Sequence, residues 1–221
     1  VFPKRFSQWS CLRKCIMTVL ITRPKHDLIT RYLCVWSEEI LAIARAHYIT
    51  VDDLEGEKAN RKNLESYIKN RPPSFVFLNG HGNAEVVTGH DNEPLVDINS
   101  RLPEVIVYAR SCDAGQVLGS ALIKNGTQAF IGYRRKFICG YTPEKMWKPL
   151  EDPIARLFLV PSNLIVSTLL KGHSVQDAHA RSKEEMYKNF KKMISSKATY
   201  EERYSARWLW SNLNNQVLLG E

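Results

Sequence analysis

Long uninterrupted hydrophobic runs are missing from this 221-residue chain. The longest apolar stretch, residues 157–170, is interrupted by a proline and by polar residues, and it is shorter than the ~20 residues that a membrane-spanning helix needs. The first residues carry basic side chains but no apolar segment of the length found in secretory signal peptides. The sequence therefore predicts neither a membrane span nor secretion.

Cysteine is sparse, with five residues at the irregular positions 11, 15, 34, 112 and 139. An odd number at such spacings is unlike the framework of a small disulfide-stabilised secreted domain, and we expect a reducing cytoplasm. Metal motifs of the Cys-x-x-Cys or His-Glu-x-x-His type are also missing. His90 and Asp91 together with Cys112 are a zinc candidate, but their spacing matches no such motif. We therefore expect no metal and no other cofactor.

Acidic residues are in the minority, at 23 against 31 lysines and arginines, which gives a net charge of +8. The basic excess is spread along the chain and is densest at residues 134–136 and 181–197, where the aromatic interleaving of nucleic-acid modules is not found. Specific nucleic-acid binding is therefore not expected.

Apolar, β-branched stretches alternate with helical patterns along the chain, and Asp27 is placed to start the first helix. We expect a hairpin-like excursion at 85–97 and an acidic loop at 52–56. This alternation predicts an α/β fold, a mostly parallel sheet with helices on both faces. In the absence of repeats or a linker we expect one domain over 1–221, with a core at about 17–193. The expected strands are 17–24, 48–51, 75–78, 105–109 and 129–132, and the expected helices are 27–47, one ending near 70, one ending at 124, 152–170, 175–193 and 200–219.

Two glycine-containing loops follow buried strands, Asn-Gly-His-Gly-Asn at 79–83 and Arg-Ser-Cys-Asp-Ala-Gly at 110–115. Neighbouring parallel strands lie ~4.8 Å apart, and their carboxyl ends meet at one edge, so His81 and Cys112 are expected to face one another. An imidazole can take the proton of a thiol nucleophile, and the backbone N–H groups of Gly82 and Cys112 can hold the oxyanion that forms.

Each of these residues also has a structural interpretation when it is taken alone. Cys112 can be a small core residue, and His81 can cap a helix or bind a carbonyl. A third member of the site is left unassigned. Asp52, Asp53 and Glu55, near the end of the second predicted strand, are candidates for orienting His81.

The His-Gly and Cys-x-x-Gly motifs, together with residues 127–132 and 169–178, resemble the caspase-like cysteine peptidases, and more narrowly their CHAT-domain and gingipain-type branch. The resemblance covers about residues 17–193. It implies a caspase-like (flavodoxin-like) fold and an endopeptidase of protein substrates without a cofactor, with His81 as general base and Cys112 as nucleophile. It also implies a regulatory sensor protein as a partner.

Arg110 lies two residues before Cys112, a position that commonly lines the specificity pocket in caspase-like families. An arginine there would favour cleavage after an acidic residue, because its guanidinium binds a carboxylate in a bidentate manner, and Arg134 and Arg135 after the next strand would add positive potential. Asp113 is a further candidate for substrate binding. The alternative is that Arg110 forms a structural ion pair with Asp113 or another acid.

Two other functions stay open at this point. One is a catalytically silent caspase-like module that binds a partner protein. The other is a flavodoxin-like binder of a small ligand, which is disfavoured because residues 23–25 lack a glycine-rich phosphate cradle.

Overall fold

The computed structural model describes residues 17–220 and contains a central six-stranded sheet with the order β2-β1-β3-β6-β7-β8. The first five of these strands are parallel to their neighbours, and β8 is antiparallel to β7. A separate antiparallel pair, β4 and β5, confirms the predicted excursion. The strands are β1 (Thr18–Arg23), β2 (Thr50–Glu55), β3 (Phe75–Asn79), β4 (Val86–Thr88), β5 (Pro94–Asp97), β6 (Ile106–Arg110), β7 (Ala129–Tyr133) and β8 (Gln216–Gly220).

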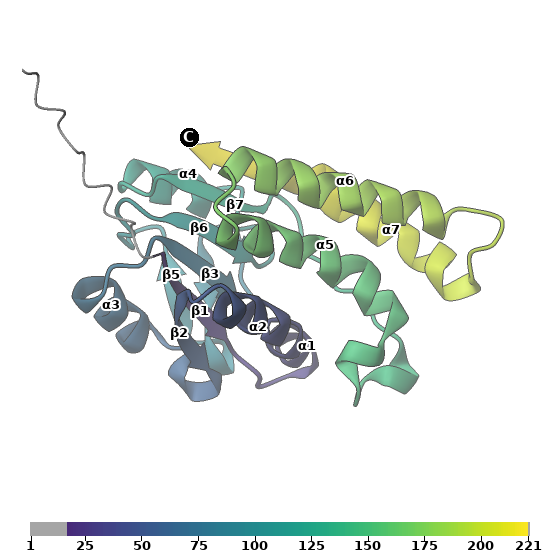
Figure 1. Ribbon diagram of the computed structural model, residues 1–221, viewed down its shortest axis with the longest axis horizontal. Coiled ribbons are helices and arrows are strands. Elements are labelled where there is room, and N and C mark those ends of the chain that lie inside the picture. The colour runs from purple at the N-terminus through teal and green to yellow at the C-terminus, as the bar shows by residue number, and fades with distance from the viewer. Residues whose placement is uncertain (1–16, 221) are drawn as a thin grey trace, which may run out of the picture.

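Helices cover both faces of the sheet (Figure 1). One face packs against α1, α2 and α5, with α6 and α7 contributing to the same core, and the other packs against α3 and α4. The predicted α/β fold is therefore confirmed. The helices are α1 (Leu28–Trp36), α2 (Glu38–Ala46), α3 (Arg61–Asn70), α4 (Leu118–Lys124), α5 (Pro153–Leu170), α6 (Val175–Met193) and α7 (Tyr200–Asn215).

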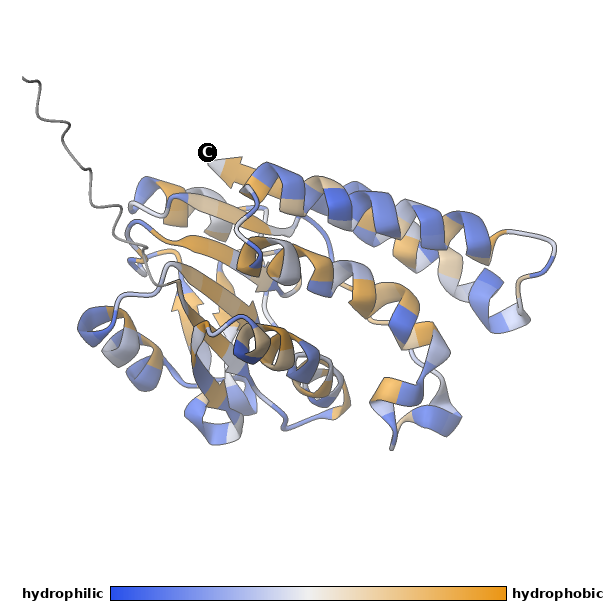
Figure 2. Ribbon diagram, viewed as in Figure 1, coloured by the Kyte–Doolittle hydropathy of each residue, from blue (hydrophilic) through white to orange (hydrophobic). Residues whose placement is uncertain are grey.

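The central strands are apolar on both sides because both sides are covered. Phe75 and Phe77 of β3 belong to the core on the α1 and α5 side, whereas Val76 and Leu78 belong to the core on the α3 and α4 side. Such strands read as continuous hydrophobic runs. Figure 2 shows the contrast between this apolar sheet and the hydrophilic outer surface of α6.

The α5 helix is long and apolar enough to cross a membrane by length and composition alone. In the structure 78% of it is buried inside the protein, between the sheet and α6, and Asp152 caps its first turn. Pro161 lies inside the helix without ending it. The burial of α5 in the core therefore explains the hydrophobicity of this helix.

The predicted helix over residues 27–47 is two helices in the structure, with the break at Ser37. The Ser37 hydroxyl donates a hydrogen bond to the Leu33 carbonyl at 2.7 Å and accepts one from Arg110 at 2.9 Å. The apolar periodicity continues through the break, so it gave no sign of this turn.

Two further predictions were wrong at the edges of the sheet. Residues 52–55 belong to strand β2 and not to a loop, and the three acidic residues among them pair with basic side chains there. Residues 216–220 are not the end of a helix but form β8, which pairs with β7. Gln216 donates hydrogen bonds to Tyr133 Oη and to Ser182 Oγ, both at 3.1 Å, which ties the start of this strand to the core.

Candidate functional site

The two loops predicted to carry the chemistry lie side by side. Strands β3 and β6 are parallel neighbours, with Asn79 paired to Arg110, and His81 and Cys112 each follow two residues later. The Ser111 hydroxyl donates a hydrogen bond to the His81 carbonyl at 2.8 Å, which joins the two loops directly. Both residues therefore stand at the same carboxyl edge of the sheet.

Glycine is required in the histidine loop because other chain segments approach it closely. A Cβ on Gly82 would overlap Ser111 Oγ and the Val86 carbonyl, and one on Gly80 would overlap the Thr88 carbonyl. These contacts press the loop against the cysteine loop and against β4.

The structure supplies a carboxylate behind the histidine that the sequence did not identify in this role. His81 Nε2 lies 2.6 Å from Oδ2 of Asp27, which is the N-cap of α1. Asp27 Oδ1 accepts a hydrogen bond from the Thr30 N–H at 2.8 Å. Burial alone would raise the pKa of the Asp27 carboxyl, but the hydrogen bonds from Thr30 and His81 hold that pKa below its usual value. Asp27 therefore caps a helix and orients His81.

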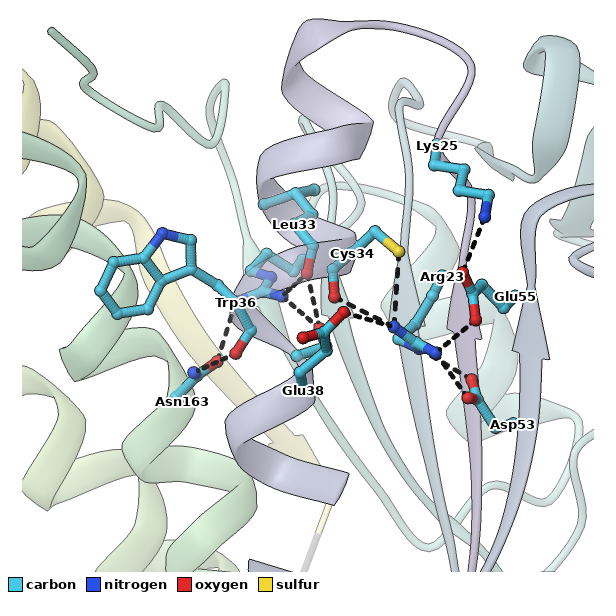
Figure 3. A network of polar contacts seen from close by, with 11 residues as sticks. Arg23, Lys25, Leu33, Cys34, Trp36, Glu38, Asp53, Glu55 and Asn163 are labelled. Atoms are coloured by element: carbon cyan, nitrogen blue, oxygen red, sulfur yellow. Dashed lines mark hydrogen bonds and ion pairs between the residues drawn. The ribbon is translucent and has the colours of Figure 1, made fainter. Parts of the chain in front are cut away.

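The candidates suggested for this role, Asp52, Asp53 and Glu55, have other partners, which corrects that suggestion. Asp52 pairs with Arg71 at 2.7 Å. Asp53 and Glu55 bind the buried Arg23 guanidinium at 2.6 and 2.9 Å, as Figure 3 shows. They lie on β2, two strands away from β3, and they neutralise basic side chains there.

Cys112 is partly buried, and its thiol is directed at the Phe137 carbonyl, 3.7 Å away. Within residues 17–220 no hydrogen bond joins it to His81. Burial raises the pKa of the Cys112 thiol, and the charge of Asp113 adds to the rise, while Phe137 and Lys136 oppose it. Its surroundings therefore favour the neutral thiol form of Cys112 more than water does.

Two backbone N–H groups of the histidine and cysteine loops have no hydrogen-bond acceptor among the described residues. In the described chain, the neighbouring Asn83 and Thr88 N–H groups are bonded to carbonyls, whereas those of Gly82 and Cys112 have no assigned acceptor. Unpaired donors beside a nucleophile can hold the oxyanion of a tetrahedral intermediate.

The placement of Arg110 corrects the predicted specificity pocket. Its side chain is fully buried on the α1 and α5 side of the sheet. It donates to Asn79 and Asn163 at 2.8 and 3.0 Å, and to the Leu33 carbonyl and Ser37 hydroxyl. Arg110 therefore cannot bind a substrate carboxylate.

Arg110 also forms no ion pair with any residue that the structure describes, so the alternative of a bridge to Asp113 is equally wrong. All four of its hydrogen-bond acceptors are uncharged, and its guanidinium carbon lies 4.9 Å from the centre of the Phe77 ring. Burial lowers the pKa of this guanidinium. The alternation of side chains along a strand does not relate Arg110 to Cys112, because β6 ends at Arg110.

A pocket of about 430 Å³ lies beside the cysteine loop and includes Asp113. The Asp113 carboxylate accepts a hydrogen bond from Gln116 at 2.9 Å, and Gln116 also donates to the Arg134 carbonyl at 2.9 Å. Arg134 itself is exposed and does not line the pocket. The pocket is lined by Asp113, Arg135, Lys136, Ile138, Trp208, Ser211 and Asn215.

The structure does not bring together the three residues of the zinc candidate, His90, Asp91 and Cys112. His90 and Asp91 lie near His26 and form a set of three ligand-bearing side chains with it. Cys112 belongs to neither of the two such sets in the described chain, the other being His26, Asp27 and His81.

No protein-family model matches the sequence, and no curated protein matches it. Among solved structures, it is similar to a complex of the Porphyromonas gingivalis RgpB pro- and mature domains, with a TM-score of 0.56 and 11% sequence identity. The similarity covers 93% of this chain but only 47% of that one, so this chain spans about half its length. RgpB is a gingipain with the caspase-like fold, and the likeness shows that fold here. It does not support the CHAT branch.

Proposed function

We propose that this chain is a cysteine endopeptidase in which Cys112 attacks peptide bonds and His81 exchanges the proton. The observation that carries the proposal is the placement of His81 and Cys112 at the carboxyl ends of adjacent parallel strands, on loops joined by the Ser111 hydrogen bond. The Asp27 carboxylate behind His81 and the two unpaired N–H groups complete a set suited to acyl transfer.

The proposed reaction begins with a rotation of the Cys112 side chain away from Phe137 and toward His81. Because Nε2 of His81 is held by Asp27, Nδ1 is the nitrogen left to accept the thiol proton. The sulfur then forms a bond to the substrate carbonyl carbon, and the N–H groups of Gly82 and Cys112 hold the resulting oxyanion.

The imidazolium formed in this step is stabilised by the Asp27 carboxylate, and it gives its proton to the nitrogen of the leaving amine as the C–N bond breaks. Water then attacks the thioester on Cys112. His81 takes a proton from that water, the C–S bond breaks, and His81 gives the proton to the sulfur. The acid product leaves, and the Cys112 thiol is restored. No cofactor is needed for this sequence.

The pocket beside Cys112 is the proposed binding site for a substrate side chain next to the scissile bond. Asp113 N–H donates to the Arg135 carbonyl at 3.2 Å, so the pocket wall and the nucleophile loop form one unit. With Asp113, Arg135 and Lys136 in its lining, the pocket has charges of both signs, and Trp208 adds an apolar surface.

A catalytically silent module that binds a protein partner is the second candidate function. It is favoured by the raised pKa of the Cys112 thiol and by its contact with Phe137 in place of His81. A silent module would keep its fold and its cleft but would hydrolyse nothing.

Cleavage of a peptide library distinguishes the two. We expect turnover by the wild-type chain and none by Cys112→Ala or His81→Ala, with all three proteins showing the same circular dichroism. Ser120→Ala is the matched control, because Ser120 is exposed on α4 and should not affect turnover. Equal turnover by the Cys112→Ala variant would refute the mechanism, and a folded wild-type protein that cleaves no peptide would favour the silent module.

We also propose a cytoplasmic location and control by a separate sensor protein. The first is supported by three cysteines that are free in the described chain, Cys34, Cys112 and Cys139. The second is supported by the resting state of the site, because the Cys112 thiol must turn before it can react.

A further inference from the structure

A group of histidines and carboxylates lies around His26, next to His81. His26 and Asp27 lie between β1 and α1, and His90 and Asp91 lie in the short turn His90–Asn92 after β4. The ring centre of His26 is 6.1 Å from that of His81 and 5.3 Å from that of His90. The mechanism proposed above uses Asp27 and His81 but leaves His26 without a role.

The two ring nitrogens of His26 are buried, and neither forms a hydrogen bond with the described residues. The His26 side chain is 10% exposed. The nearest carboxylate oxygen is Asp27 Oδ2, at 3.6 Å from Nε2. Buried polar groups are normally paired because an unpaired one costs free energy, so an imidazole with two free nitrogens calls for a ligand.

The distances around His26 fit a small divalent ion. Ring nitrogens of His26 and His81 and a carboxylate oxygen of Asp27 all lie within 4.8 Å of one another. Ligands about 2.0–2.1 Å from a tetrahedral zinc ion are about 3.3 Å apart. The distances from Asp27 Oδ2 to the two histidines, 2.6 and 3.6 Å, lie on either side of that spacing.

The chemical types of the three ligand atoms indicate which metal ion the site would bind. Two neutral imidazoles and one carboxylate are typical of zinc and similar transition metals, whereas magnesium and calcium prefer sites made of oxygen atoms. Three protein ligands also leave a fourth position for water.

We propose that His26, Asp27 and His81 form a binding site for Zn²⁺ that inhibits the peptidase by occupying its general base. The inhibition rests on the proposed function, whereas the binding of the ion does not. Because Asp27 holds Nε2 of His81, this is the nitrogen that an ion bound to Asp27 reaches. With the metal on Nε2, the proton of the neutral ring is placed on Nδ1, which then cannot accept the proton of Cys112.

His26 is also part of the second set, with His90 and Asp91. We assign the ion to the first set because Asp27 lies within 3.6 Å of both histidines, whereas His90 Nε2 is 3.7 Å from Asp91, which is itself largely exposed. Measurements of Zn²⁺ binding by His26→Gln and His90→Gln variants distinguish the two candidate metal positions.

Zn²⁺ binding is measured on the metal-free protein by competition with a chromophoric chelator, and Co²⁺ absorption reports the coordination geometry. We expect His26→Gln to weaken Zn²⁺ binding at least ~10-fold, as even the loss of a residue that only supports a ligand can do. His90→Gln and His173→Gln, the latter an exposed residue far along the chain, should bind like wild type. Cys112→Ser should also retain binding.

Unchanged Zn²⁺ affinity in His26→Gln, or loss of binding in His90→Gln or Cys112→Ser, would overturn the proposed site. If His26→Gln does not fold, His81→Gln carries the same binding test because it removes a second ligand.

Inhibition is measured separately, with each variant compared with its own metal-free rate. Zn²⁺ should stop turnover by wild type and affect His26→Gln at least ~10-fold less. Zn²⁺ binding that depends on His26 in a protein that cleaves no peptide would leave the site standing and refute the peptidase. Turnover by a protein without His26-dependent Zn²⁺ binding would support the peptidase and refute the metal site.

Discussion

Replacement of Asp27 by asparagine separates its two roles, because asparagine caps a helix about as well as aspartate but carries no charge. A hydrogen bond to a charged group contributes about 1.5–3 kcal/mol and a neutral one about 0.5–1.5 kcal/mol. The side chains of Asp27 and His81 are 38% and 37% exposed, so solvent screening places the difference near the lower end, at about 1 kcal/mol. The imidazolium of the transition state should therefore be stabilised less, and kcat/KM should fall roughly five- to tenfold.

The assay is steady-state cleavage of a peptide found in the library screen, with thermal unfolding measured on the same samples. The stability of Asp27→Asn should change by less than about 1 kcal/mol, the contribution of one charge at a helix N-terminus. Ser174→Ala is the matched control, because it removes the N-cap of α6 far from the site and should lower stability by about 1 kcal/mol without changing kcat/KM. Wild-type kcat/KM in Asp27→Asn would show that Asp27 is only a helix cap.

Three more outcomes follow from the structure. Arg110→Met should destabilise the fold by at least about 1–3 kcal/mol, because it leaves buried acceptors such as Asn79 unpaired, and a denaturation midpoint equal to wild type would contradict this. Alkylation of Cys112 by iodoacetamide should titrate above the pH of an ordinary thiol, and Asp113→Asn should lower that midpoint because a nearby negative charge is removed; an upward shift would refute the assigned cause. Deletion of residues 216–221 should expose the edge of β7, and light scattering should detect aggregation, whereas a monomer with unchanged melting would contradict the role of β8.

The sequence was sufficient to predict the alternating fold and the two loops at the centre of the sheet. Buried strands such as Phe75–Asn79 are continuous apolar runs, and glycines next to His81 signal close chain approach, so both features are local. The neighbouring positions of β3 and β6 followed from the rules for parallel sheets.

The wrong or missing assignments depend on contacts between residues far apart in sequence. The partner of His81 is Asp27, 54 residues away, and only the helix-cap role of Asp27 is visible locally. The direction of the Arg110 side chain is set by acceptors on α1 and α5, which no spacing within β6 reveals. The strand Gln216–Gly220 continues an apolar pattern that a helix can equally produce.

The most direct test of the central claim is the rate at which a peptidyl acyloxymethyl ketone labels each cysteine, read by mass spectrometry. The proposed mechanism predicts labelling of Cys112 and not of the buried Cys34 or Cys139, with the rate lowered at least ~100-fold in His81→Ala, the lower limit for loss of a general base. Labelling of Cys112 at the same rate in wild type and His81→Ala would contradict the proposal that these two residues act together.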